Sequence, residues 1–254
     1  MIPQIPNPVI QVKNAGHWFT PSQWLFRNLG FTVNEGEITA ILGPNGRGKT
    51  TLLKAISQSL HLREGLIEVE SGPPGIVPQA AGTVSFSVLE MVLLGRSQHI
   101  GRFSSPSRKD YEKARKILHR LGLSELELRR FDHLSGGQKQ LVLLARALAC
   151  ESRALILDEP GSALDLANQK MLLQTLRQLA IDDNLAILFT THDPQHALAI
   201  ADNVLMLLGS NDVIRGKPCE VFTEYSLEKL YGIKIHCISV DNIGKHQIAI
   251  LPHF

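Results

Sequence analysis

The stretch Glu37-Ile-Thr-Ala-Ile-Leu-Gly-Pro-Asn-Gly-Arg-Gly-Lys-Thr-Thr-Leu-Leu-Lys-Ala-Ile56 decides the fold of this chain. It opens with an apolar run at 38–42 that is typical of a buried parallel strand. Glycines interrupt the run, and apolar residues return at helical spacing from Leu52 onward. Residues 43–50 fit the pattern G-x-x-x-x-G-K-[ST] of a phosphate-binding loop, in the strand–loop–helix order that the pattern requires.

Each residue type in this loop suits phosphate binding. Gly43, Gly46 and Gly48 let the backbone curl, so that successive N–H groups point at one centre. The following helix directs its positive end to the same place. Lys49 adds a mobile positive charge for the β- and γ-phosphates, and Thr50 offers a hydroxyl to Mg²⁺. The alternative is a Gly-rich turn with a solvated lysine, and the order of the elements argues against it.

The composition limits the class of protein. The chain has 254 residues and is 44% apolar, enough for a sizeable core. The net charge of +2 and the lack of a long basic run argue against nucleic acid as a partner. The three cysteines are far apart, as expected of a reduced cytosolic protein. Residues 1–8 resemble a Pro-rich tail rather than a signal peptide, and no apolar run approaches the roughly 18–20 residues of a membrane span.

Periodicity predicts alternating strands and helices. The predicted strands are 9–12, 25–33, 65–69, 75–79, 153–157, 185–191, 202–208 and 212–215, with two weak strands near the C-terminus. The predicted helices follow Lys49 and cover 84–95, 110–121, 123–130, 139–149, 166–180 and 226–232. The helices between 80 and 130 indicate a helical insertion in an α/β protein.

Polar residues at strand ends supply candidate catalytic groups, because ligands of open α/β sheets bind at the carboxyl ends of the strands. Asp158 would hold Mg²⁺, and Glu159 would orient and deprotonate an attacking water. His192 would hydrogen-bond the γ-phosphate, and Gln79 could contact Mg²⁺ or the water. Each would mean little alone, since acidic pairs and single polar residues are usually solvated.

Three aromatic residues, Trp18, Phe19 and Trp24, lie in a predicted loop between the first two strands. An aromatic side chain near the phosphate loop could stack on adenine, which offers a flat π-face. We favour Phe19 for this role, with Trp18 as the alternative. The other possibility is that all three cap the edge of a sheet.

Ser135, Gly136, Gly137 and Gln138 form a second candidate anion site, with a hydroxyl and bare backbone at the start of a helix. An ordinary helix cap is the alternative. One nucleotide is expected for each phosphate loop, so a second cradle needs a reason. A dimer supplies one, because this cradle could close over the nucleotide of a second copy.

Together these stretches resemble the nucleotide-binding subunit of ABC transporters over roughly residues 9–232. The resemblance identifies 43–50 as Walker A, Gln79 as the Q-loop, 134–138 as the signature, 155–159 as Walker B with its base, and His192 as the switch histidine. It adds Asn45 and Thr51 to the ATP contacts and assigns Asp165 to the D-loop. It implies a head-to-tail homodimer that binds two ATP molecules with Mg²⁺. Each ATP lies between Walker A of one copy and the signature of the other.

The same resemblance implies the fold: an α/β P-loop NTPase with a mixed, mainly parallel core sheet, an N-terminal antiparallel β subdomain and an inserted α-helical subdomain. We expect a single ATPase domain. Residues 1–79 and 131–254 would form the RecA-like core with the antiparallel subdomain, 80–130 the helical subdomain, and 233–254 a short C-terminal extension.

A finer resemblance rests on residues 87–96 followed by His99 and Asp110. It is to importers of iron–siderophores, haem, vitamin B12 and molybdate or tungstate. It implies a peripheral ATPase on the cytoplasmic face of the inner membrane, with two transmembrane permease subunits and, indirectly, an extracytoplasmic binding protein. One alternative is a soluble ABC ATPase of the iron–sulfur assembly type. Another is a nucleotide-gated DNA-repair module, against which the missing heptad run and basic patch argue.

Two residues depart from the family pattern. Arg47 replaces a small residue in the phosphate loop and adds charge near the phosphates or the second copy. Gly161 stands after Pro160, where Thr or a bulkier residue is usual, and is expected to loosen the link between Walker B and the D-loop.

Overall fold

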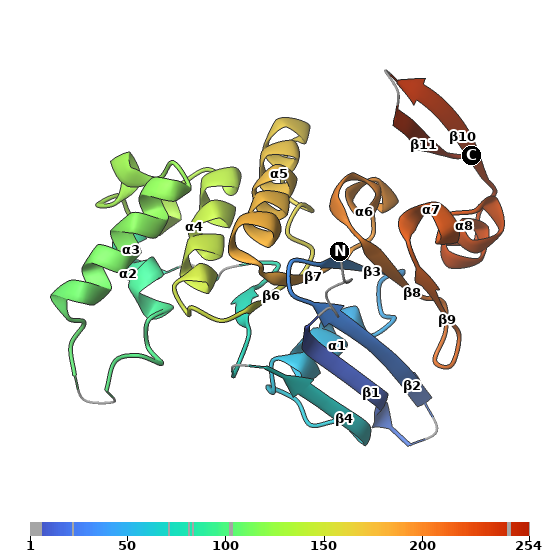
Figure 1. The fold of residues 1–254 in the computed structure, drawn as a ribbon, viewed down its shortest axis with the longest axis horizontal. Coiled ribbons are helices and arrows are strands. Elements are labelled where there is room, and N and C mark those ends of the chain that lie inside the picture. The colour runs from blue at the N-terminus through green and yellow to red at the C-terminus, as the bar shows by residue number, and fades with distance from the viewer. Residues whose placement is uncertain are drawn as a thin grey trace, which may run out of the picture.

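The structure is a computed structural model that describes residues 7–253, with the exception of 22, 71, 81, 83, 102–103 and 243–244. Its core is a six-stranded sheet with the strand order β5-β6-β7-β3-β8-β9 (Figure 1). The strands are β3 (Ile38–Leu42), β5 (Gly75–Val77), β6 (Ala154–Leu157), β7 (Ala186–Thr191), β8 (Asn203–Leu207) and β9 (Val213–Gly216). All neighbouring pairs are parallel except β8 with β9. The predicted mixed, mainly parallel sheet is therefore confirmed.

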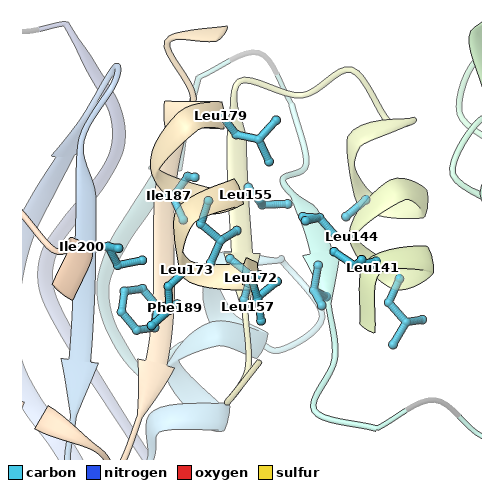
Figure 2. Close-up of a cluster of buried hydrophobic side chains, with 14 of the residues drawn as sticks. Leu141, Leu144, Leu155, Leu157, Leu172, Leu173, Leu179, Ile187, Phe189 and Ile200 are labelled. Atoms are coloured by element: carbon cyan, nitrogen blue, oxygen red, sulfur yellow. The ribbon is translucent and has the colours of Figure 1, made fainter. Parts of the chain in front are cut away.

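Both faces of the core sheet are covered, which explains why its inner strands are continuously apolar. Side chains alternate between the two faces along each strand. On one face, Ile41, Ile156 and Leu188 pack toward the helix α1 (Lys49–Ile56) and the antiparallel sheet. On the other face, the leucines of α5 (Leu166–Asp183) lie over strands β6 and β7, as Figure 2 shows.

A three-stranded antiparallel sheet with the order β2-β1-β4 forms the predicted β subdomain. Its strands are β1 (Pro8–Thr20), β2 (Gln23–Asn34) and β4 (Glu64–Val69). The predicted aromatic loop is wrong, because Trp18, Phe19 and Trp24 lie on β1 and β2, and Trp18 pairs with Trp24. These residue types favour strands, and the antiparallel pairing extends almost to the hairpin turn.

The predicted helical insertion is present as α2 (Val88–Leu94) and α3 (Arg108–Arg120), which pack on each other and on α4 (Gly136–Leu148) (Figure 1). The helix α2 begins later than predicted, because Ser87 forms a capping box with Glu90. The helix predicted at 123–130 is wrong: only the 3₁₀ turn Ser124–Leu126 (η1) forms there. The next carbonyls bond to the start of α2 instead, since Val88 and Leu89 donate their N–H groups to residues 129 and 127.

A network of charged residues, buried at Arg96 and Asp110 and exposed at Glu151, ties this helical layer together. Arg96 is only 4% exposed, and its guanidinium lies 3.1 Å from Asp110 Oδ1 and 2.8 Å from Glu151 Oε2. Hydrogen bonds from Ser107, together with the Arg96 pair, lower the pKa of Asp110 to about 2. Lys113 and then Arg96 lower the pKa of Glu151 to about 2. We call Arg96, Asp110 and Glu151 the Arg96 network.

The C-terminal part completes the core and then leaves it. It contains α6 (Pro194–Ile200), α7 (Pro218–Val221), α8 (Glu224–Tyr231) and the hairpin of β10 (Ile235–Asn242) and β11 (Lys245–Pro252). Helices α6 and α7 are not predicted from the sequence, because they are short and begin at proline. The hairpin extends away from the core sheet beyond α8 (Figure 1). Among the described residues, no helix is both long enough and apolar enough to cross a bilayer.

Candidate active site

The phosphate loop lies between β3 and α1, where the sequence places it. Gly46 and Gly48 have φ values of 81° and 86°, a left-handed region that favours glycine. Gly48 also leaves no free space, because a Cβ there would lie 3.2 Å from both Leu25 and Phe26. Lys49 Nζ donates to the carbonyl of Gly43 at 2.6 Å, so the loop holds its own lysine across the turn.

Two of the three predicted magnesium ligands, Thr50 and Asp158, meet at the ends of the parallel strands. Thr50 Oγ1, at the start of α1, donates to Asp158 Oδ2 at 2.8 Å. Thr190 Oγ1, near the end of β7, donates to Asp158 Oδ1 at 2.6 Å. A hydroxyl and a carboxylate in contact are oxygen donors of the kind Mg²⁺ prefers. These residues fit the predicted metal, with the remaining positions open to water and phosphate oxygens.

Glu159 is the meeting point of the predicted catalytic residues. Its carboxylate lies 3.4 Å from Lys49 Nζ, 3.1 Å from His192 Nδ1 and 3.4 Å from Gln79 Nε2. Its side chain is 11% exposed. The backbone at Glu159 has φ 44°, which is uncommon for a residue other than glycine and is found at functional sites. Its N–H donates to Thr190 Oγ1 at 2.9 Å, which holds this turn in place.

Thr190 is a site residue that the sequence analysis misses. One hydroxyl serves both neighbours, since it donates to Asp158 and accepts from the Glu159 N–H. The signal lies in the register of β6 and β7: Leu157 pairs with Phe189, so the following residues of both strands become neighbours. A strand prediction without pairing does not contain this information.

A pocket of about 360 Å³ collects most of the predicted ATP contacts, within the size range of small-ligand sites. Its lining residues are Phe19, Leu25, Asn45, Gly46, Gly48, Lys49, Thr50, Thr51, Gln79 and Glu159. Leu25 is the one member that the sequence analysis does not name. Gly43 lies just behind, with its carbonyl bonded to Lys49. Arg47 is exposed and is not among the lining residues.

Strand alternation separates the two aromatic candidates. Phe19 lines the pocket, is 67% exposed, and meets His17 edge-on with ring centroids 5.1 Å apart. Trp18 points to the opposite face of β1 and packs against Trp24, with centroids 4.3 Å apart. Arg63 lies over the Trp18 ring at 5.5 Å. The geometry therefore favours Phe19 as the residue facing a nucleotide.

The second cradle lies at the start of α4, apart from the residues that line this pocket. Ser135 caps the helix by accepting from the Gln138 N–H at 3.3 Å, and Gln138 Oε1 accepts from the Ser135 N–H at 3.1 Å. A helix cap is thus present. Gly136 follows the cap, and Gly137 has no space for a Cβ, which would lie 2.8 Å from Asn168.

The predicted D-loop borders this cradle through the same asparagine. Asp165 caps α5 by accepting from the N–H and the Nδ2 of Asn168, both at 2.8 Å. Gly161, which precedes the D-loop, is buried against the ring of His196. The two departures from the family pattern therefore differ: Arg47 faces solvent, whereas Gly161 is packed.

Comparison with known proteins gives one consistent result. The family model described as ABC transporter matches residues 26–162. The chain is 39% identical to the molybdate import ATP-binding protein MolC of Haemophilus influenzae, over 98% of this chain and 96% of that protein. It is 36% identical to the hemin import ATP-binding protein HmuV of Shewanella denitrificans, over 82% and 87%. A solved structure described as an inward-facing transporter of the metal-chelate type has a TM-score of 0.92 and 38% identity, over 98% of both chains.

Proposed function

The chain belongs to the ATP-binding proteins of ABC transporters, which are ATPases, and from this membership we propose that it powers the import of a metal chelate or a metal oxyanion. The near full-length likeness to a molybdate import protein carries the proposal. The hemin import relative supports the same wider class, because haem is also a metal-containing cargo. The alternative of an iron–sulfur assembly ATPase is not favoured, since these relatives are import proteins.

In the proposed reaction, Glu159 is the general base. It takes a proton from the water that attacks the γ-phosphate, and His192 and Gln79 hold that water and the phosphate in line. The contacts of Glu159 with these two residues support their shared role. Lys49 and the N–H groups of the phosphate loop stabilise the charge on the transferred phosphoryl group. Phe19 stacks on the adenine.

Thr50, Asp158 and Gln79 would hold Mg²⁺, together with oxygens of the nucleotide. When bound, this ion neutralises charge on the β- and γ-phosphates. Thr190 keeps the Asp158 carboxylate oriented toward Thr50 by donating to its other oxygen.

The proposed working unit is a homodimer on two permease subunits, at the cytoplasmic face of the membrane, served by an extracytoplasmic binding protein. Ser135, Gly136, Gly137 and Gln138 would contact the ATP of the second copy. ATP then bridges the two chains and closes the dimer, and its hydrolysis removes the bridge. The helical layer would pass this movement to the permease.

The test is to purify the tagged protein from gently solubilised native membranes and to identify its partners by mass spectrometry. A multi-span permease at equal stoichiometry is the expected result. Uptake of radiolabelled molybdate and of haem by vesicles containing that permease then separates the two cargo classes. Recovery with a soluble assembly complex, and absence from membranes, would overturn the importer proposal.

A further inference from the structure

Two turns of the chain at the active site are in contact with each other. None of the roles proposed above for ATP hydrolysis explains this contact. The strands β6 and β7 are parallel neighbours, and each ends in a turn. The first turn carries Glu159 and continues through Pro160 to Gly161. The second carries His192 and continues into the helix α6. The distance between Glu159 and His192 therefore depends on how these two turns are spaced.

Gly161 has no free space on its side-chain face. A Cβ at this position would lie 2.9 Å from Cε1 of the His196 ring, closer than side-chain contacts normally allow, with Nδ1 of the same ring at 3.4 Å. The φ of Gly161 lies outside the left-handed region that favours glycine. Space rather than backbone conformation thus requires glycine here. The ring of His196 occupies the volume that a side chain at 161 would fill.

The His196 ring is fixed on its own side of the contact. Its side chain is 12% exposed, and its Nδ1 lies 3.3 Å from Thr191 Oγ1. Thr191 directly precedes His192, and its hydroxyl also accepts from the Asp193 N–H at 3.0 Å. Moving the ring away would therefore break its hydrogen bond to Thr191, in the turn that carries His192.

The Gly161 side of the contact is equally constrained. Its carbonyl accepts from Gln169 Nε2 at 3.1 Å and from the N–H of Leu164 at 3.2 Å. Behind His192, Tyr231 donates its hydroxyl to the His192 carbonyl at 2.8 Å. Both turns are thus held by hydrogen bonds to other parts of the chain, and the His196 ring lies between them.

We propose that His196 is a positioning residue for ATP hydrolysis, because its ring against Gly161 sets the spacing between the turns that carry Glu159 and His192. The inference rests on the roles proposed above for these two residues. It also revises the expectation for Gly161: this glycine does not loosen the chain before the D-loop, because a side chain from α6 fills the space. A bulky residue at 161 and histidine at 196 exclude each other.

The test is a double-mutant cycle on the full-length protein in its copurified transporter, with ATPase kinetics as the readout. Gly161→Thr is expected to lower kcat by roughly tenfold or more with KM for ATP within about twofold, since small displacements of catalytic groups act mainly on turnover. His196→Ala is expected to lower kcat less, about threefold. The double variant is expected to return to the kcat of His196→Ala, because the smaller residue at 196 makes room for the methyl and hydroxyl groups of the introduced threonine.

Gly161→Ala provides a milder change if Gly161→Thr does not fold, and the same rescue by His196→Ala is expected. Gly209→Ala is the matched control, because a Cβ there meets its nearest neighbour at 3.5 Å, an ordinary contact. Wild-type kcat in both Gly161 variants, or a double variant no faster than its Gly161 parent, would overturn the inference. A wild-type complex that does not hydrolyse ATP would instead refute the proposed function itself.

Discussion

Replacing Phe19 with alanine should weaken ATP binding and leave turnover nearly unchanged. Phe19 lines the pocket above the phosphate loop and is 67% exposed, so one ring face is available for a base. Stacking of a base on an aromatic side chain contributes about 1–3 kcal/mol by alanine substitution. We expect the lower part of this range, about 1–2 kcal/mol, because so exposed a ring also leaves the base partly in water. This corresponds to a rise in KM of roughly 5- to 30-fold.

The assay is steady-state ATP hydrolysis by the purified transporter, with Phe19→Tyr and Trp18→Ala beside Phe19→Ala. Tyrosine keeps the aromatic face and should keep KM within about twofold. Trp18 lies on the other face of β1 against Trp24, so its removal should leave KM for ATP unchanged. The melting temperature of each variant shows whether the hairpin has survived. An unchanged KM in a folded Phe19→Ala variant, or a rise in Trp18→Ala alone, would refute the assignment.

Four further outcomes are expected. Glu159→Gln should bind ATP but lose at least ~10²-fold in kcat, as for a lost general base; near-normal turnover would exclude that role. Arg96→Leu should lower the free energy of unfolding by about 3 kcal/mol, measured by urea denaturation, because it leaves the buried Asp110 carboxylate and the Ala149 carbonyl without their donor. Asp110 and Glu151 have pKa values of about 2, below their ordinary 3.8 and 4.5, so the unfolded chain binds more protons; stability should fall as pH drops from about 4.5 to about 2, and less steeply in Asp110→Asn. Gly95→Ala should destabilise by about 1–3 kcal/mol, since its Cβ would collide with the Arg146 carbonyl oxygen and lie 2.9 Å from the Cβ of Ala149, and an unaltered melting temperature would contradict that packing.

The parts of the site that the sequence predicts are those that depend on local order. A phosphate loop can be recognised from a strand, glycines and a helix in succession. Asp158 and Glu159 can be recognised because they follow an apolar strand. Thr190 escapes the sequence analysis because its role depends on which strand pairs with β6. The preference for Phe19 over Trp18 likewise acquires its physical reason only from the hairpin register.

The elements of the fold divide in the same way, into those that local sequence determines and those that depend on distant contacts. The core strands are predicted because each is buried along its whole length. The helix predicted at 123–130 fails, because its carbonyls find partners in α2, far away in the sequence. The packing of Gly161 against His196 is equally non-local. The sequence therefore suggests a loose chain at this glycine, whereas in the structure the His196 ring fills the space beside it.

The Arg96 network bears on how ABC ATPases are assigned to a cargo class from their sequences. Residues in and around 87–96, with Asp110, suggest a cargo class in the sequence, yet Arg96 contacts Asp110, Glu151 and the carbonyl of Ala149 at the end of α4. These contacts connect the end of α2, the start of α3 and the end of α4 within the ATPase. The pattern therefore reflects packing within this chain. Exchanging the network between two importers should alter how well the chain folds and leave what the transporter carries unchanged.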